Sequence, residues 1–294
     1  MQHTHHAGLE SLWVSAPLIL VALVYMLGWL RIRKINPETL EDWRVGSFLL
    51  GLFLIWLAMA SPIAALDHEL LTIHMVQHLL LMTLAPPLIW LGAPMKPLLH
   101  GLPQGFGNAM SHFFRSPPIQ RLSRAIAHPA VCWLAAAATL VGWHVPCLFA
   151  LGMRSGLWHT IEQVSFLTSG LLFWWPVIKP GQGASNGSEW PILLYLFLAT
   201  LPCDILSGFL VFCDRVVYPV FISSPHPLGF SALEDQQRAG ALMWTCVTLV
   251  YLIAGTVFAA RLLSPESSHQ YRAVKSDSIL STVPQTIEQS MEVV

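Results

Sequence analysis

The sequence predicts an all-α, polytopic membrane protein with seven transmembrane helices. Apolar residues make up 54% and charged residues only 11% of the 294 residues, and the mean hydropathy is +0.59. This balance is foreign to a water-soluble globule of that length. The apolar residues also fall into seven runs, each near the roughly 20 residues that a helix needs to cross the hydrocarbon core. The predicted spans are 11–30, 45–63, 70–92, 128–150, 157–178, 190–212 and 238–260.

Most of these runs end at a recognisable signal, either a basic cluster or a proline or glycine. Away from their ends, the runs hold two formally charged residues, Glu162 and Asp204. The end signals are Arg31, Arg33 and Lys34 after the first run, Ser61-Pro62 after the second, Gly92-Ala93-Pro94 after the third and Lys179-Pro180-Gly181 after the fifth.

The positions of lysine and arginine predict the orientation. If the N-terminus lies outside, twelve of the fifteen basic residues fall in cytoplasmic segments and three in external ones. Cytoplasmic loops are the ones that carry such an excess. The leading MQHTHHAGLE has no basic stretch, so the first run is expected to be a retained helix and not a cleaved signal peptide. We therefore predict an N-out, C-in topology.

Two segments fall outside the predicted spans. Residues 95–127 mix aromatic and aliphatic residues with three arginines, a pattern typical of short helices that lie at the membrane surface, here on the cytoplasmic side. Residues 264–294 are rich in Ser, Gln, Glu and Val without a helical apolar period, so they are expected to form a flexible cytoplasmic tail. The membrane domain is thus predicted to cover residues 1–263.

Four histidines are predicted to share one layer near the outer membrane boundary. His74 and His78, in HMVQHLL, are four residues apart and lie on one face of the third predicted helix. At about 1.5 Å per residue they lie some 6 and 12 Å below its outer end. His144 lies at a similar depth in the fourth run, and His159 lies near the start of the fifth. A single membrane histidine usually bonds one helix to another, but four in one layer favour a metal site.

The metal favoured by this pattern is copper, as Cu(I), because imidazole binds copper well and soft sulfur ligands select its reduced form. Sulfur-bearing residues near the layer are Met75, Met82, Met153, Met243 and Cys147, although methionine in a membrane helix usually serves packing. The five cysteines form no C-x-x-C pair, so neither a disulfide framework nor a zinc ribbon is indicated.

Two carboxylates are candidates to accept a hydrogen bond from the second ring nitrogen of a ligand histidine. Glu162 follows His159 by three residues on the same helical face, and Asp235 stands in LEDQQRAG at the outer start of the seventh helix. A carboxylate that accepts from the second ring nitrogen fixes the tautomer of a ligand histidine. Asp235 also suits a helix start, where the helix dipole favours an acid, and both interpretations can hold together.

Five segments stand out along the chain: QHLLLMTLAPPLIWLGAP (77–94), HPAVCWLAAAATLVGWHVP (128–146), WHTIEQVSFLTSGLLFWWPVI (158–178), YPVF (218–221) and LEDQQRAGALMW (233–244). Together they resemble the multi-spanning CtaG family of cytochrome c oxidase assembly factors. The resemblance implies a multi-pass protein of the bacterial plasma (inner) membrane that is needed to make active haem–copper oxidase of the caa type, by helping copper reach it. It implies roles for His74, His78, His144, His159 and the Asp235-Gln236 pair. One turn after His159, where we expect relatives to carry a second histidine, this chain has Gln163, and an amide is a poor copper ligand.

The sequence therefore predicts a copper-binding assembly factor that works from the extracytoplasmic side and passes copper to an oxidase subunit or a copper chaperone. We expect no catalysis, because the sequence singles out no catalytic triad or phosphate loop, and no nucleic-acid signature is present. Two alternatives stay open: a membrane electron carrier that binds haem b through histidines of separate helices, and a structural assembly partner whose histidines only bond helix to helix. A channel or transporter is less favoured, since the inner halves of the spans hold few polar residues.

Overall fold

The computed structural model describes residues 3–35, 41–178, 190–223 and 229–263, and within them the chain forms helices and no strand. The all-α prediction is confirmed for this part of the chain, while the predicted tail 264–294 lies outside it. The elements are α1 His3–Ile35, α2 Asp42–Ala60, the 3-10 turn η1 Ala64–Leu66, α3 Leu71–His78, the π-helical turn η2 Leu79–Leu84, α4 Ala85–Leu91, α5 Met95–Gly101, α6 Gln104–Arg115, α7 Pro117–Ile126, α8 Pro129–His144, α9 Pro146–Arg154, α10 Gly156–Ile178, α11 Trp190–Phe212, the 3-10 turn η4 Pro219–Phe221 and α12 Ala232–Leu263.

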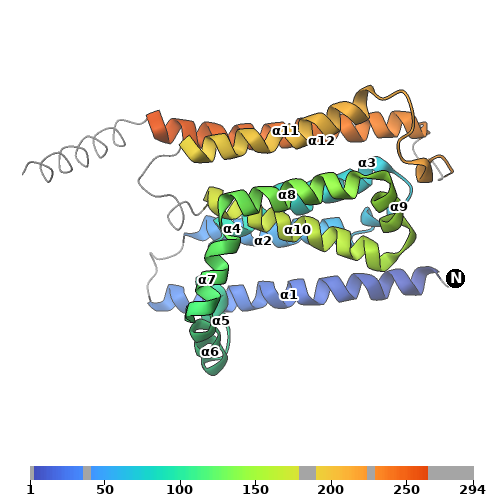
Figure 1. Cartoon of the computed structure of the whole chain (residues 1–294). Coiled ribbons are helices and arrows are strands. Elements are labelled where there is room, and N and C mark those ends of the chain that lie inside the picture. The colour runs from blue at the N-terminus through green and yellow to red at the C-terminus, as the bar shows by residue number, and fades with distance from the viewer. Residues whose placement is uncertain (1–2, 36–40, 179–189, 224–228, 264–294) are drawn as a thin grey trace, which may run out of the picture.

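The long helices run side by side along one direction (Figure 1). The start of α1, the helix α3 and the short helix α9 lie at one end of the bundle, whereas α5, α6 and α7 lie toward the other end. Apolar side chains on the outer helices are widely exposed, among them Trp13 at 79%, Ile205 at 73% and Phe212 at 76%. Such surfaces suit contact with lipid.

Five helical segments are long and apolar enough to cross a membrane: Leu12–Ile35, Asp42–Ala60, Leu71–Leu91, Trp190–Phe212 and Ala232–Ala260. They correspond to five of the seven predicted spans. The other two predicted spans correspond to α8, which has 16 residues, and α10, which has 23 residues but carries Glu162 and Gln163. Helices α7 and α8 are long and apolar enough to cross a membrane only when they are taken together, and this pair is bent by 59°. The count of seven and the N-out orientation stay predictions.

The fourth predicted span is not one helix over 128–150, and this prediction was wrong. Helix α8 ends at His144, and the separate helix α9 begins at Pro146. Val145 between them is extended, with φ −66° and ψ 124°. The proline ring disfavours helical geometry at the preceding residue, which explains the break. His144 is therefore the last residue of its helix.

A π-helical turn interrupts the third span directly after His78. The amide of Ala85 donates to the carbonyl of Leu80, five residues earlier. Because Pro86 has no N–H, the carbonyl of Met82 has no α-helical partner. The indole Nε1 of Trp174, on α10, donates to that carbonyl instead at 3.2 Å. The π-turn is thus stabilised by the same helix that carries His159 and Glu162.

Gly170 lets α10 approach this turn closely. A Cβ at Gly170 would lie 2.7 Å from both the Cα and the carbonyl oxygen of Met82, which is closer than real Cβ atoms come. Small residues commonly permit such close backbone contact between membrane helices. Helix α10 and the π-turn η2, which directly follows His78, are therefore in close backbone contact.

The segment 95–127 forms the three short helices α5, α6 and α7. Both faces of α6 and α7 are largely exposed, and the apolar side chains Phe113, Phe114 and Leu122 are each between 45% and 56% exposed. The first helix of this group, α5, packs against α1, where Arg31 donates to the carbonyls of His100, Gly101 and Leu102 at the end of α5.

Candidate metal centre

Three of the four predicted histidines gather around Glu162 at the end of the bundle where α1 begins. Glu162 Oε1 lies 3.4 Å from His74 Nε2 and 3.3 Å from His78 Nε2, and Glu162 Oε2 lies 3.4 Å from His159 Nδ1. The Nε2 atoms of His74 and His78 are 2.8 Å apart. His74 is fully buried and Glu162 is 1% exposed. We call His74, His78, His159 and Glu162 the histidine–glutamate cluster.

Asp67, in the loop after α2, extends this cluster toward the surface. Its Oδ2 lies 2.9 Å from His159 Nε2, and Gln77 Nε2 donates to the same oxygen at 3.0 Å. Burial raises the pKa of Asp67, but the hydrogen bond and charge of His159 together with His68 and Gln77 outweigh it, so the net pKa lies below its ordinary value. The side chain is therefore an ionised carboxylate.

The ligand atoms fit a metal ion. One ligand atom from each of His74, His78 and Glu162 lies within 4.8 Å of the others, and the same holds for Asp67, His74 and His159. Both carboxylate oxygens of Glu162 are buried without a hydrogen bond, as are Nδ1 of His74, His78 and His159. The Nδ1 atoms of His74 and His78 lie on the other side of rings whose Nε2 atoms face Glu162. Buried polar groups are normally satisfied, so the two Glu162 oxygens, which face ring nitrogens at 3.3 to 3.4 Å without a hydrogen bond, call for a further partner. A cation bound among these oxygens and ring nitrogens would supply one.

The charge balance points the same way. Two buried carboxylates, Asp67 and Glu162, face three imidazoles. With both carboxylates ionised and His74 and His78 neutral, one negative charge remains uncompensated if His159 carries a proton, and two remain if it is neutral. An uncompensated buried charge is costly. A monovalent or divalent cation among these side chains would remove the imbalance.

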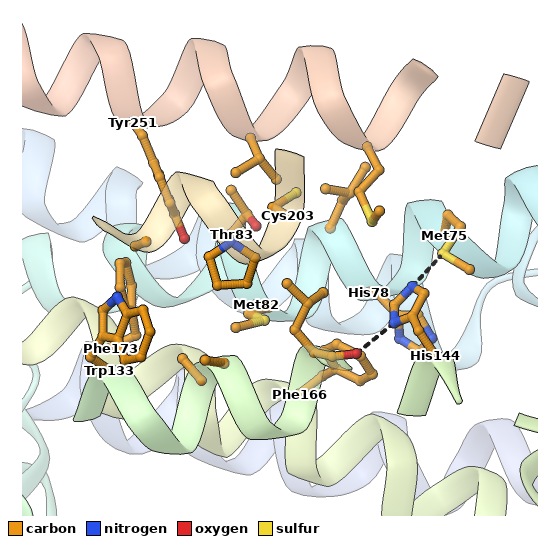
Figure 2. A pocket seen from close by; sticks show the side chains of 18 residues that line it. Met75, His78, Met82, Thr83, Trp133, His144, Phe166, Phe173, Cys203 and Tyr251 are labelled. Carbon is orange, nitrogen blue, oxygen red and sulfur yellow. Dashed lines mark hydrogen bonds between the residues drawn. The ribbon is translucent and has the colours of Figure 1, made fainter. Parts of the chain in front are cut away.

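His144 lies next to this cluster but is not part of it. Its ring centroid is 6.2 Å from that of His78, and its Nε2 lies 3.3 Å from the sulfur of Met75. Its Nδ1 lies 2.7 Å from the carbonyl oxygen of Leu140. Figure 2 shows both of these contacts as dashed lines. The predicted layer of four histidines is thus divided into a group of three and a neighbour that faces a thioether.

Aromatic rings fix the orientation of the imidazoles. The ring of Phe166 stacks on His78 at a centroid distance of 3.9 Å, and the ring of Phe149 meets His74 at 4.9 Å. Both phenylalanines are at most 2% exposed. Because the interior is close-packed, the imidazoles have little freedom to turn away from Glu162.

Asp235 holds the start of α3 and does not support a ligand histidine. Its carboxylate accepts from the amides of Leu71 and Thr72 at 2.6 and 3.2 Å and from the Thr72 hydroxyl at 2.5 Å. The first amides of a helix lack partners within it, and the helix dipole favours a negative charge there. The predicted contact with a ring nitrogen is therefore corrected. The expected acid at a helix start is confirmed, because Asp235 lies in the first turn of α12, and its carboxylate also caps the start of α3. Asp235 fixes the position of the helix that carries His74 and His78.

The neighbouring Gln236 supports the end of α8 indirectly, through the segment that carries Tyr218. Its Oε1 accepts from the amide of Val217 at 2.7 Å, and its Nε2 donates to the carbonyl of Arg215 at 3.1 Å. Tyr218 directly follows Val217 in the chain, and its hydroxyl donates to the carbonyl of His144 at 3.0 Å. The Asp235-Gln236 pair thus positions His74 and His78 on one side and His144 on the other.

Gly152 leaves room for the carboxylate of Glu162. A Cβ at Gly152 would lie 2.8 Å from Glu162 Oε2. We expect Gly152→Ala to displace this flexible carboxylate and to weaken metal binding by about 10-fold, in the range seen when a group that orients a ligand is lost. The measurement is a metal titration of the purified variant. Gly142→Ala is the matched control, because a Cβ there would meet nothing within 4 Å. Equal affinities in the two variants would contradict this role of Gly152.

Asp67 was not predicted as a site residue, because it lies in the loop between α2 and α3, where no helical period applies. The available signal was an acidic residue directly before His68 at the outer end of a span. Among the other candidates, Gln163 Nε2 lies 2.9 Å from His159 Nε2, and Cys147 is an exposed free cysteine. Among the sulfur-bearing residues named from the sequence, Met75 is the one whose sulfur lies against a candidate histidine, His144.

Comparison with known proteins agrees with the resemblance seen in the sequence. The chain is 24% identical to an uncharacterized protein of Mycobacterium bovis and to one of Mycobacterium tuberculosis, each over 249 residues that make up 80% of this chain. It is 22% identical over 255 residues to an uncharacterized protein of Mycobacterium leprae, covering 82% of this chain. The chain spans little more than a third of the length of these relatives, 36% to 37%. No solved structure gives a significant match. The family described as cytochrome c oxidase caa3 assembly factor (Caa3_CtaG) matches residues 23–264, so the chain belongs to this family.

Proposed function

We propose that this protein helps to assemble a haem–copper oxidase by binding copper in the histidine–glutamate cluster and passing it to an oxidase subunit or a copper chaperone. The observation that carries the proposal is the buried carboxylate of Glu162, which lies among three imidazoles and makes no hydrogen bond. Membership of the family of oxidase assembly factors supports the choice of metal, because the product of that assembly contains copper. Copper is here the cargo, and no catalytic step is required.

The ligand types bear on the form of copper that this cluster holds. Imidazole suits copper in general, whereas carboxylate oxygen favours harder, more highly charged ions. With Glu162 and Asp67 in contact with the histidines, the cluster suits a divalent ion such as Cu(II). The sequence-based expectation of Cu(I) rested instead on the histidines and on sulfur-bearing side chains near them.

A route for the ion leads from the surface to the cluster. His68 is 52% exposed, and its Nε2 lies 3.8 Å from Asp67 Oδ1. Asp67 contacts His159 at 2.9 Å, and His159 contacts Glu162. The path leads from an exposed histidine to side chains that are at most 11% exposed, and such a series of neighbouring ligands permits transfer by ligand exchange. The start of α1 lies at this same end of the bundle (Figure 1), so with the N-out topology that the basic residues favour, the route opens on the extracytoplasmic side.

The haem alternative finds no support in the site. The cavity beside His78 and His144 has a volume of about 40 Å³, enough for a few water molecules but not for a porphyrin. The structural alternative, in which the histidines only bond helix to helix, is the one that an experiment must separate from copper binding.

The test is metal analysis of the purified full-length chain beside a His74→Ala, His78→Ala double variant after incubation with copper. We expect the wild type to retain copper and the variant to lose nearly all of it, because two of the imidazoles that face Glu162 are gone. In cells, the variant is expected to lower oxidase activity and the copper content of the oxidase.

The matched control is a His100→Ala, His112→Ala variant, which removes two exposed histidines at the opposite end of the bundle. It should bind copper as the wild type does. Full copper retention in the His74, His78 variant, together with normal oxidase activity, would leave the purely structural role as the better account.

A further inference from the structure

We propose that Met75 and His144 form a second metal position, separate from the histidine–glutamate cluster and selective for Cu(I). This inference rests on the proposed function in that it assigns the copper pathway a reduced-metal site. It is carried by one contact, the 3.3 Å between His144 Nε2 and Met75 Sδ, and by the cavity that this contact borders.

The first step concerns the proton on His144. Its Nδ1 lies 2.7 Å from the carbonyl oxygen of Leu140. A carbonyl can only accept, so Nδ1 carries the hydrogen, and in the neutral ring Nε2 then has a free lone pair. A second proton on Nε2 would place a cation in a residue that is only 5% exposed, at a high cost in solvation.

The second step concerns what this lone pair faces. The sulfur of Met75 is a thioether, which has lone pairs and no hydrogen to donate. Two electron-pair donors therefore point at each other in a buried place, and Figure 2 shows them converging from α3 and α8. With metal–nitrogen and metal–sulfur bonds of about 2.0 and 2.3 Å, a 3.3 Å separation corresponds to a ligand–metal–ligand angle of about 100°. The pair is thus spaced as two ligands of one ion.

The third step concerns the kind of ion. Thioether sulfur selects soft metals, and among the biological ones Cu(I) is the ion that it suits best together with imidazole. The cavity of about 40 Å³ next to the pair is bordered by three further sulfur-bearing side chains, Met82, Cys203 and Met243, each at most 8% exposed. In Figure 2, Met75 and His144 lie at one end of this cavity and Trp133, Phe173 and Tyr251 at the other. Neither aspartate nor glutamate borders it.

The two positions therefore differ in chemistry although they are neighbours. The cluster offers carboxylate oxygen and imidazole nitrogen, and the second position offers thioether sulfur and imidazole nitrogen. His78 borders both, because it contacts Glu162 at 3.3 Å and also lines the cavity. An ion can thus be held on either side of His78 according to its oxidation state.

The experiment titrates the detergent-purified, full-length chain with Ag(I), a redox-inert analogue of Cu(I), and separately with Co(II), which favours oxygen and nitrogen ligands. Met75→Leu is nearly isosteric and removes only the sulfur. We expect it to weaken Ag(I) binding by at least 10-fold and to leave Co(II) binding unchanged. Met153→Leu is the matched control, because Met153 is also buried but does not border the cavity. X-ray absorption of the Cu(I)-loaded wild type should show sulfur scattering that Met75→Leu loses.

Each outcome decides between the two proposals. Unchanged Ag(I) affinity in Met75→Leu, or Cu(I) without sulfur scattering in the wild type, would overturn the second position and leave the cluster intact. A Glu162→Gln variant that binds Co(II) like the wild type would instead refute the cluster as a metal site, with the Met75–His144 position unaffected. If Met75→Leu and Glu162→Gln each weakened the binding of both ions, there would be one mixed site, and the separate Cu(I) position would be rejected.

Discussion

Replacing Glu162 with glutamine is expected to lower the affinity of the chain for a divalent metal ion by about 100-fold or more. The substitution keeps the shape of the side chain but removes a charged oxygen ligand from between three imidazoles. Loss of a group that only orients a metal ligand already lowers metal affinity by roughly 10- to 100-fold. The measurement is the rise in melting temperature on adding Cu(II) or Co(II), since an ion that binds only the folded state stabilises it by mass action.

The stability of the metal-free variant carries a second expectation. Without an ion, Glu162 is a buried carboxylate whose oxygens make no hydrogen bond, so glutamine there should cost little or even stabilise the protein. Glu234→Gln makes the same change at an exposed position on α12 and serves as the control. If Glu162→Gln kept the full metal-dependent shift, the carboxylate would not be a ligand. A large loss of metal-free stability would instead mark Glu162 as a structural hydrogen-bonding residue.

The second large effect is expected for Asp235→Ala, which should lower the free energy of unfolding by about 3 kcal/mol. Three hydrogen bonds to a charged acceptor are lost, each worth roughly 1.5–3 kcal/mol, while the cost of burying that charge is recovered. The measurement is reversible unfolding in detergent micelles. Metal affinity should fall as well, because the amides of Leu71 and Thr72 begin the helix that carries His74 and His78.

Two comparisons make this prediction specific. Asp235→Asn retains one acceptor oxygen and should lose less stability than the alanine variant. Thr72→Val removes one of the three hydrogen bonds, and its effect should be smaller when Asp235 is already alanine, since the two residues share that bond. Additive losses, or a change below about 1 kcal/mol for Asp235→Ala, would show that α3 is positioned by its packing alone.

Hydropathy was sufficient to locate the helices but not their breaks and partners. The runs at 11–30, 45–63, 190–212 and 238–260 are helical, apart from residues 61–63 after the end of α2, because a chain in lipid must satisfy its own backbone groups. The break at Val145 could have been predicted, since Pro146 was visible in the sequence. The π-turn at Leu79–Leu84 was harder to foresee, because it depends on Pro86 and on an indole supplied by another helix.

For the candidate site, too, the sequence predicted the contacts within one helix but not those between distant segments. Helical spacing correctly grouped His74 with His78 and His159 with Glu162, because residues three or four apart share a face. The sequence also placed His144 in the same layer, and its ring lies 6.2 Å from that of His78, but a shared layer does not fix the direction in which a ring points, and this one faces Met75. Asp67 and the partner of Asp235 depend on contacts across loops and between distant helices, which periodicity does not encode.

The π-turn has a consequence for aligning and engineering this region. An extra residue in a helical turn shifts the angular phase of everything on one side of it by about 100°. A helical wheel drawn over residues 71–91 as one uniform helix therefore misassigns the faces of Ala85–Leu91 relative to His74 and His78. Related chains that lack one residue between 79 and 84 would present these imidazoles to a different neighbour, so single-residue gaps at that point should be treated as changes of site geometry and not as alignment noise.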